Sequence, residues 1–318
     1  MARRRLPPRL LEGGGTPAVT SESTAPLVLA VPVFNGERFL AETLTSLNAQ
    51  GENVRWWFQD GASKDGTLEI AHRFARPGDH IVSEPDTGQP DALNRAFRQM
   101  GGEIVGFLNA DDVLLPGTAR TVLDYFAAHP GIDLVCGEVE WIDEQSKVTG
   151  RHAGRIESLA DVLDIYNVWW SNRQWVQPEV FFRRSLWEKT GGFDTAWNLV
   201  FDYEFWVRCF RAGARIAHLP VPFTQFRLHA AQKSSAATQA ADEIRAVVRQ
   251  HLDDGAEMPA RRRWALEAQL SYDLYQGGRN GAARRSFPAE VLRHPQWLLS
   301  PPARARLRAA CTRLLKQR

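Results

Sequence analysis

Short apolar runs and segments with helical periodicity alternate along the first half of the chain. Runs rich in valine, isoleucine and leucine predict strands at residues 27–33, 54–59, 81–82, 104–108 and 134–135. Between them, apolar residues recur every three or four positions, which predicts helices near residues 37–49, 68–74, 91–100 and 117–128. Elements of this length that alternate in this way predict an α/β fold, with a mostly parallel sheet flanked by helices.

Polar residues follow these predicted strands at the point where each strand ends. Asn35 follows the first strand, Asp60 the second, Glu84 and Asp86 the third, and Asn109 the fourth. The carboxyl ends of parallel strands meet at one edge of a sheet, and ligands bind there in open α/β folds. The sequence therefore predicts a binding site along that edge.

The fourth predicted strand ends in Asn109-Ala-Asp-Asp112. An amide and two adjacent carboxylates offer the oxygen ligands with which a protein holds a hard divalent cation that it shares with phosphates. Asn and Asp also favour turns for local reasons, so the segment alone is equally compatible with a strand that ends in a turn.

The composition changes on both sides of this α/β region. Residues 1–25 are rich in Arg, Pro, Gly, Ser and Thr and predict a disordered tail. From residue 236 the pattern becomes helical and polar, with candidate helices at 243–252 and 261–274. We therefore expect a domain over residues 26–235, followed by a helical C-terminal extension over residues 236–318.

The last segment, residues 303–318, has the pattern of a basic amphipathic helix. Leu307, Ala310, Cys311 and Leu314 share one face among six basic residues. Such a helix is suited to peripheral contact with an anionic membrane, here the inner face of the cell membrane. The alternative, which we favour, is a helix that packs on its own domain with its charged face in water.

The bulk composition narrows the class of protein. The 318 residues carry a net charge of +2, so nothing global argues for nucleic acid as a partner. Cys136, Cys209 and Cys311 are odd in number and lack CxxC spacing, which favours a reducing compartment and no zinc site. No apolar run reaches the roughly 18 residues of a membrane-spanning helix. The start of the chain lacks the apolar core of a secretory signal, so we expect a cytoplasmic protein.

Two common nucleotide-binding motifs do not occur in the sequence. No GxGxxG follows the first predicted strand, and GxxxxGK[ST] is absent, which argues against a dinucleotide-binding domain and a P-loop NTPase. If phosphates bind to this chain, a metal ion must provide much of the neutralising charge.

Taken together, several segments resemble the family 2 glycosyltransferases, which are inverting enzymes with the GT-A (Rossmann-like) fold. The resemblance runs from about Leu27 to Ser234, and its five pieces follow one another in order. They are Val31-Pro-Val-Phe-Asn-Gly36; Asp60-Gly-Ala-Ser-Lys-Asp-Gly-Thr67, which is similar to a DGSxDGT segment with Ala62 as an extra residue; Ser83 to Asn94; Asn109-Ala-Asp-Asp112, which is similar to a DxD-type motif; and Gly191-Gly-Phe-Asp194 with Asp202-Tyr-Glu-Phe-Trp206.

The resemblance implies a donor site for a nucleoside-diphosphate sugar at the predicted edge. Asp60 corresponds to the position that reads the nucleotide base, and an Asx-turn is its structural alternative. Gln89 and Asp91 are positioned for ribose, phosphate or sugar hydroxyls, although capping of the next helix is an equally good interpretation. The expected donor-binding residues are Pro32, Phe34, Asn35, Glu37, Asp60, Gln89, Asp91, Asn94, Asn109 and Asp111.

The resemblance also implies a divalent cation, Mg²⁺ or Mn²⁺, that bridges the two phosphates. Asp111 is the expected principal ligand, with Asp112 bound through water or holding the loop. Asn109 departs from the usual aspartate of the motif and is expected to act indirectly. Arg227-Leu-His229 resembles an RxH ending of the family, in which His229 completes the metal shell or contacts the pyrophosphate and Arg227 is a nearby counter-charge. A structural role is the alternative for the histidine.

Inversion in a single displacement requires a base on the acceptor side. Asp202 resembles the family's catalytic aspartate, which removes a proton from the acceptor hydroxyl. Glu204 is the competing candidate, and residues two apart on a helix do not share a face, so only one can point into the site. Many relatives have an acid immediately before this aspartate, whereas this chain has Phe201.

The expected acceptor side is rich in tryptophan. Seven of the 11 tryptophans lie between Trp141 and Trp206. The stretch from Tyr166 to Asn172 has no clean period and is expected to be a loop, so Trp169, Trp170 and Trp175, with Glu204, are candidates for contact with a saccharide or lipid-linked acceptor. Core packing is the alternative interpretation.

The sequence thus predicts a metal-dependent, inverting glycosyltransferase in cell-surface polysaccharide or glycolipid biosynthesis. Two other classes remain as alternatives. A sugar-1-phosphate nucleotidyltransferase usually has a Gly-rich loop after the first strand, and Val31 to Arg38 has none. A non-catalytic saccharide-binding module on a degenerate transferase fold is disfavoured by the joint presence of Asp60, Asp111 and Asp202.

Overall fold

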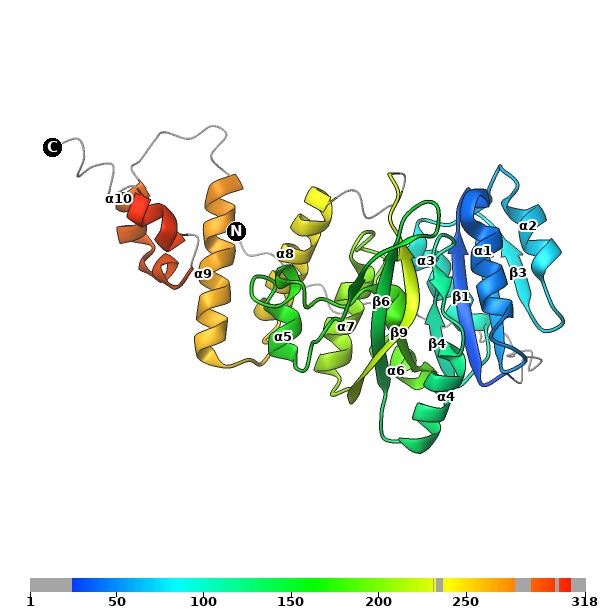
Figure 1. The fold of residues 1–318 in the computed structure, drawn as a ribbon. Helices are drawn as coiled ribbons and strands as arrows, with labels where there is room; N and C mark the ends of the chain where they lie inside the picture. Colours follow the sequence, from blue (N-terminus) through cyan, green and yellow to red (C-terminus); the bar gives the residue numbers. More distant parts are fainter. Residues whose placement is uncertain (1–24, 231, 233–236, 278–286, 301–302, 310–318) are drawn as a thin grey trace.

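A nine-stranded sheet is the centre of the computed structural model, which describes residues 25–230, 232, 237–277, 287–300 and 303–309 (Figure 1). The strands follow the order β3-β2-β1-β4-β8-β6-β9-β5, and β7 pairs with β6. Their bounds are β1 Leu27–Val33, β2 Val54–Asp60, β3 His80–Ser83, β4 Ile104–Phe107, β5 Val113–Leu114, β6 Leu134–Ile142, β7 Val148–His152, β8 Val180–Arg183 and β9 Ile216–Arg227. The predicted tail, residues 1–25, lies outside the described residues except for Ala25.

Six of these strands run in one direction. β1, β2, β3 and β4 are mutually parallel, and β6 and β9 share their direction, whereas β5, β7 and β8 run the opposite way. The predicted α/β fold with a mostly parallel sheet is therefore confirmed. β8 lies antiparallel between β4 and β6, so the loop before β8 reaches the edge at which β4 and β6 end.

The first predicted strand matches β1, and β2 and β4 each differ from prediction by one residue. The prediction for β6 was wrong in length, since only Leu134 and Val135 were expected and the strand continues to Ile142. Gly137 interrupts the apolar run of β6, and Glu140 interrupts it again. The sequence therefore shows no continuous apolar pattern in the second half of the strand. Glu140 is buried there because it accepts hydrogen bonds from Arg151 and Gln225.

Helices cover both faces of the sheet. α1, α2 and α4 pack on one face, where the core includes the odd-numbered apolar residues of β1. α3, α6 and α7 pack on the other face, with Val28 and Ala30 of β1 in their core. The helix bounds are α1 Glu37–Asn48, α2 Thr67–Phe74, α3 Gln89–Gln99, α4 Thr118–Ala128, α5 Leu159–Leu163, α6 Arg184–Thr190 and α7 Phe201–Arg211.

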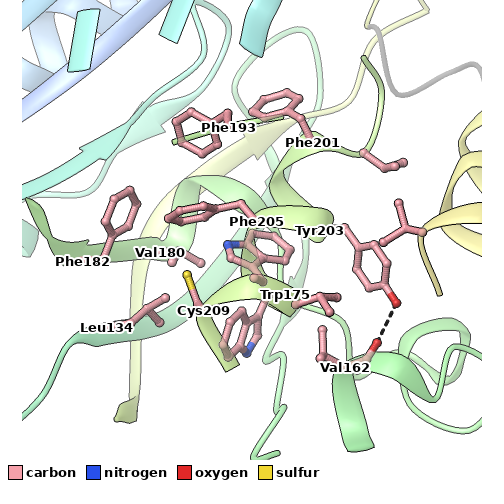
Figure 2. Packing of buried hydrophobic residues seen from close by; sticks show 14 of the residues in the cluster. Leu134, Val162, Trp175, Val180, Phe182, Phe193, Phe201, Tyr203, Phe205 and Cys209 are labelled. Carbon is pink, nitrogen blue, oxygen red and sulfur yellow. Dashed lines mark hydrogen bonds between the residues drawn. The ribbon is translucent and has the colours of Figure 1, made fainter. Parts of the chain in front are cut away.

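The second core is unusually aromatic (Figure 2). Phe193 packs edge-on against Phe201 with ring centroids 5.5 Å apart, and the hydroxyl of Tyr203 donates to Val162 O at 2.8 Å. Trp175 also belongs to this core and is 2% exposed, with its ring 5.7 Å from Phe210. This cluster joins the first turn of α7 to the sheet.

The C-terminal extension is helical, as expected, in the part that the structure describes. It comprises α8 Ala237–Asp253, α9 Ala260–Gly277, α10 Phe287–Arg293 and the 3₁₀ helix η4 Pro295–Leu299. α8 contributes Val247 and Val248 to the aromatic core, whereas α9, α10 and η4 lie at the far end of the molecule from β3 (Figure 1). Among the described residues, no helix is long and apolar enough to cross a membrane.

Residues 303–309 are helical, and residues 310–318 of the predicted amphipathic helix lie outside the described residues. Ala303 is buried in a small cluster with Tyr272, Val291 and Trp297, and Leu307 packs against that cluster. The described part of this segment therefore packs on its own extension.

Candidate active site

Two loops at the carboxyl ends of β1 and β2 hold each other in place. The backbone N–H of Asn35 donates to Ser63 Oγ at 2.7 Å, and Lys64 N donates to Asn35 Oδ1 at 2.9 Å. Glu37 Oε2 accepts from Gly66 N at 2.6 Å. Asn35 and Glu37 were expected to bind the donor, but the structure gives both side chains loop contacts. Pro32 is buried within β1, so its expected donor contact has no exposed side chain to make it.

Asp60 ends β2 and is fully buried. Ser83 Oγ donates to Asp60 Oδ2 at 2.6 Å, and Ser63 N donates to the same oxygen at 3.1 Å. The Asx-turn interpretation of Asp60 is therefore correct in geometry. The carboxylate can take part in base recognition only if a ligand displaces or joins these hydrogen bonds.

Phe34 is the exposed member of this corner, with 66% of its surface accessible. It lies beside Gly61, because a methyl group on Gly61 would come 3.4 Å from Phe34 Cδ2 and 2.8 Å from Asp86 Oδ2. An aromatic face and a carboxylate thus flank a residue that has no side chain. Glycine is needed here because Asp86 and Phe34 occupy the space that a side chain would take, and the exposed ring of Phe34 is what this corner offers to a flat ligand.

Asn109 and Gln89 connect the loop after β4 to α3. Gln89 Nε2 donates to Asn109 Oδ1 at 2.8 Å, and Asn109 Nδ2 donates to Asp112 Oδ2 at 3.1 Å. The other oxygen of Asp112 accepts from Arg227 N at 3.0 Å. Burial, followed by the neighbouring charge of Asp111, raises the pKa of Asp112 well above its usual value. Asp112 is 1% exposed, so of its two expected roles, binding the metal through water or holding the loop, these contacts support the second.

Asp111 points out of the same loop and meets His229. Oδ2 of Asp111 lies 2.9 Å from Nε2 of His229, and the two side chains are 30% and 9% exposed. The ring of Phe39 packs 5.1 Å from the imidazole and supports its orientation. Two of the three expected metal ligands are therefore neighbours.

The Asp111–His229 pair fits a cation that is shared with a ligand. Two neighbouring ligands of an octahedral ion at about 2.1 Å are themselves about 3.0 Å apart, close to the 2.9 Å that separates these atoms. Within the described residues, no three His, Cys, Asp or Glu side chains form a group that could enclose an ion. Oxygens of phosphate and water would complete the shell, as is usual for Mg²⁺.

Arg227 connects several segments next to this pair, and its side chain is fully buried. Its Nε donates to Asp111 O at 2.9 Å, and Nη2 donates to Glu42 Oε2 at 2.6 Å. Nη1 donates to Asp143 O and Ser146 Oγ, at 3.0 and 2.9 Å. The guanidinium is committed to these protein partners, so its expected role as a nearby counter-charge could act only through its field and stays a prediction.

Asp91 and Asn94, both expected at the donor site, serve the fold. Thr87 N and Arg95 Nη2 donate to Asp91 Oδ2, at 3.0 and 2.9 Å. Burial opposes ionisation of Asp91, but these hydrogen bonds outweigh it and lower its pKa. Asn94 exchanges two hydrogen bonds, of 2.7 and 2.8 Å, with the backbone of Phe193. The contacts of Asp91 match its alternative interpretation, capping of the next helix, and Asn94 links α3 to the loop that leads to α7. Donor contact by either residue stays a prediction.

Asp202 and Glu204 point to different environments, as their spacing predicts. Asp202 lies in the first turn of α7 and is partly exposed, while its neighbour Phe201 packs 5.8 Å from Phe107 at the end of β4. Glu204 is 2% exposed and accepts three hydrogen bonds from Arg208 of 2.7 to 2.9 Å. Burial opposes its ionisation, but hydrogen bonds from His251 and Arg208 lower its pKa. Glu204 therefore forms a buried ion pair with Arg208. This contact corrects the expectation that Glu204 lies on the acceptor side.

The three expected acceptor tryptophans have three different environments. Trp175 is in the core, so the expectation that it lies on a binding surface was wrong. Trp169 is half-buried and packs 4.5 Å from Tyr203. Trp170 is 41% exposed, within a short 3₁₀ helix, Trp169–Ser171, where Arg245 lies 5.0 Å over its ring. Trp170 alone of the three offers a large accessible face.

Gln177 lies at this edge and was not identified from the sequence. It begins the 3₁₀ helix before β8, Gln177–Glu179, and donates from Nε2 to Phe107 O at 2.8 Å. Its Oε1 is buried without a partner among the described residues. The carboxamide therefore lies between the end of β4 and the acceptor side. A Gln-Pro pair carries no periodicity, so only its place before an antiparallel strand could have indicated it.

Comparisons with known proteins give one consistent result. Residues 28–201 match the sequence profile of the family described as glycosyl transferase family 2. The PGL/p-HBAD biosynthesis glycosyltransferase of Mycobacterium tuberculosis (strain ATCC 25618 / H37Rv) is 31% identical over 193 residues, which cover 59% of this chain and 71% of that relative.

Solved structures show the same fold at low identity. Staphylococcus aureus TarS in complex with UDP superposes with a TM-score of 0.58 and 18% identity, covering 85% of this chain and 77% of that one. The mannosyltransferase PcManGT from Pyrobaculum calidifontis, in complex with GDP-Man and Mn²⁺, gives a TM-score of 0.56 and 21% identity. That match covers 91% of this chain and 87% of the other.

Proposed function

The chain belongs to glycosyltransferase family 2 and has its GT-A fold, and from this premise we propose that it transfers a sugar from a nucleoside-diphosphate sugar to a hydroxyl acceptor with inversion, aided by a divalent cation. The observation that carries the proposal is the arrangement of three side chains. Asp111 and His229 meet 2.9 Å apart, and Asp202 follows Phe201, which packs on Phe107 two residues before the Asn109–Asp112 loop.

The nucleoside would occupy the corner formed by Phe34, Gly61 and Asp86. Phe34 offers an exposed ring for stacking, and Asp86 lies beside it across Gly61. Asp60 is buried and accepts from Ser83, so it would accept from the edge of a base only where a ligand displaces or joins that hydrogen bond. This corner selects for a planar group with a polar edge.

Asp111 Oδ2 and His229 Nε2 would hold a Mg²⁺ or Mn²⁺ ion together with oxygens of the diphosphate. The solved mannosyltransferase contains GDP-Man and Mn²⁺. When bound, such an ion supplies Lewis-acid stabilisation to the leaving nucleoside diphosphate. The protein's own part is to fix the two ligands, since Arg227, Asp112 and Asn109 immobilise the loop that carries Asp111.

Asp202 would be the base that activates the acceptor hydroxyl. Its carboxylate lies in the first turn of α7 and is partly exposed. An ionised carboxylate within reach of the acceptor hydroxyl removes its proton as the new glycosidic bond forms. Glu204 is excluded from this role because Arg208 and the core occupy it.

Trp170 would contact the acceptor, because its ring is accessible. Gln177 is buried and bonds Phe107 O, so it would support the site without touching the ligand. The similarity to the mycobacterial PGL/p-HBAD biosynthesis glycosyltransferase supports an acceptor in glycolipid or cell-surface polysaccharide biosynthesis for this chain as well.

The test is a thermal-shift screen of UDP, GDP, TDP and CDP with and without Mn²⁺, followed by donor hydrolysis with the diphosphate sugars of the best base. We expect one diphosphate to raise the melting temperature in a metal-dependent way, because binding to the native state stabilises it. Asp124→Asn, an exposed change on α4, is the matched control for Asp111→Asn. No shift with any diphosphate and no hydrolysis would instead indicate a saccharide-binding module on a degenerate transferase fold.

A further inference from the structure

Exposed apolar side chains gather on the far end of the C-terminal extension. Of the nine large hydrophobic residues that are exposed among the described residues, four lie between positions 264 and 299. Trp264 is 62% exposed on α9, and Leu298 and Leu299 are 44% and 42% exposed on η4. Trp297, which comes directly before the two leucines, is buried, so the leucines face outward from a packed turn.

Trp264 and Leu299 belong to one surface, because they line the same groove between α9 and η4. The groove has a volume of about 460 Å³, and its α9 wall is formed by Trp264, Glu267, Ala268 and Ser271, at the spacing of one helix face. Trp297 Nε1 donates to Ser271 Oγ at 3.1 Å and fixes η4 against α9. We call Trp264, Leu298 and Leu299 the apolar face.

Basic side chains surround the apolar face. Nη1 of Arg304 donates to Leu298 O at 2.8 Å, which places this exposed guanidinium next to the leucines. Arg261 is exposed on α9 one turn before Trp264, on the adjacent helix face, where it lines a neighbouring groove with Asp164. The described residues between 260 and 309 contain seven arginines and three acidic residues, and the acid nearest to Trp264, Glu267, is paired with Arg263. The surface is thus both apolar and cationic.

Hydrogen bonds and ion pairs join α9 to the segment that carries Trp170. The hydroxyl of Tyr166 donates to Asp273 of α9, and Arg245 of α8 bonds the same carboxylate at 3.1 Å while lying over Trp170. Arg262, next to Arg261, pairs with Asp161 at 3.0 Å. A surface that binds the apolar face would therefore lie in a fixed position relative to the acceptor side.

We propose that the apolar face, with Arg261 and Arg304, docks on the surface of an anionic lipid bilayer. Tryptophan and leucine enter the boundary between headgroups and acyl chains, and arginines on the same surface attract anionic headgroups. The position of this face, fixed to the Trp170 segment, implies that the acceptor is presented from the bilayer, and this part rests on the proposed glycosyltransferase function. This docking surface shares Arg304 with the segment 303–318 that the sequence singled out, but its apolar side chains come from α9 and η4.

The experiment is flotation of the full chain with vesicles of phosphatidylcholine, alone or mixed with phosphatidylglycerol. We expect the protein to float with the mixed vesicles and to remain in solution with phosphatidylcholine alone. The double variant Trp264→Ser/Leu299→Ser should bind mixed vesicles roughly tenfold more weakly than the wild type, because two interfacial anchors are lost. Arg304→Gln should weaken binding in the same direction, and high salt should do so as well.

The control is Val148→Ser, which removes an exposed apolar side chain on β7 and should leave flotation unchanged. Three results would overturn the proposal: no flotation of the wild type, equal flotation with both kinds of vesicle, or equal flotation of the double variant. A dimer in light scattering that the double variant abolishes, without vesicle binding, would assign the face to a second copy of the chain. The nucleoside-diphosphate thermal shift, measured on the same preparations, separates failure of docking from failure of the proposed enzyme function.

Discussion

Nε2 of His229 lies 2.9 Å from Oδ2 of Asp111, although 118 residues separate them in the chain. Two strand ends bring them together: Asp111 follows β4, and His229 follows β9. Arg227, the last residue of β9, donates from its backbone to Asp112 and from its side chain to Asp111 O. The protein itself therefore fixes this pair, and if the pair holds a cation as we propose, it meets the condition of preorganisation for electrostatic catalysis.

The first prediction is that Asp111 and His229 act as one unit. Asp111→Asn and His229→Gln should each weaken metal-dependent binding of the nucleoside diphosphate and lower kcat/KM by roughly a hundredfold or more. The double variant should lose little beyond either single variant, because one missing ligand already disables the pair. Titration calorimetry with and without Mn²⁺ measures this, with Asp124→Asn as the surface control. Additive losses would show that the two residues act separately.

The second prediction concerns Arg227 as the residue that positions the loop. Arg227→Lys keeps the charge but loses the planar fork that reaches Asp111, Asp143 and Glu42 together. We expect the free energy of unfolding to fall by about 3 kcal/mol, as for a broken buried ion pair, and the affinity for the metal-bound diphosphate to fall as well. Urea denaturation and calorimetry measure the two effects. Arg120→Lys, on the exposed face of α4, should change neither.

Much of the fold was predictable because its first half follows local rules. The strand Leu27–Val33 is a continuous apolar run, and the helix after it has one apolar face of Leu40, Leu44 and Leu47. Both patterns survive folding because each element buries the same side chains that define its period. The second half of β6 follows no such pattern: the burial of Glu140 depends on Arg151 of β7 and Gln225 of β9, which a local pattern cannot pair with it.

The site was predictable in its residues more than in its roles. A motif indicates which residues lie at the edge, and Asp111 and His229 do meet there. It does not indicate which side-chain oxygen already accepts a hydrogen bond within the protein. For this reason Asp91, Asn94 and Asp112 were counted among the residues that contact the donor or the metal, although they hold the loops. Gln177 shows the opposite error, since its position depends on β8 lying antiparallel between β4 and β6.

The third prediction separates Asp202 from Glu204. Asp202→Asn should keep donor affinity and lower kcat by roughly 10²- to 10⁴-fold, because only proton transfer is lost. Glu204→Gln should keep kcat but lower the free energy of unfolding by about 3 kcal/mol, since Arg208 then loses its buried partner. Steady-state kinetics beside urea denaturation distinguishes the two. An inactive, fully stable Glu204→Gln variant would reverse the assignment of the base.

The fourth prediction concerns Ala62, the extra residue in the loop after β2. Its φ of +64° lies in the left-handed region, which an alanine side chain disfavours. Ala62→Gly should relieve this strain and raise the free energy of unfolding by up to about 1 kcal/mol. Ala41→Gly, in the middle of α1, is the matched control and should lower it by about 1 kcal/mol. Equal destabilisation by both substitutions would show that the loop gains nothing from glycine.

The last prediction is a pH dependence of stability that arises from Glu179. This carboxyl is fully buried, and Oε2 has no hydrogen-bond partner among the described residues, so burial raises its pKa well above the ordinary 4.5. The unfolded chain releases this proton near its ordinary pKa, whereas the native state retains it to higher pH. The stabilisation is therefore complete below about pH 4.5 and is lost as the pH rises toward the pKa of the folded state.

Glu179→Gln cannot titrate but keeps an oxygen for the N–H of Val176. We expect its free energy of unfolding to fall less than that of the wild type between about pH 5 and about pH 8. Urea denaturation across this range measures the difference, and Glu69→Gln, an exposed change on α2, should follow the wild type. Parallel curves for the wild type and Glu179→Gln would mean that Glu179 is ionised in the native state, and then a cation or donor must lie beside Oε2.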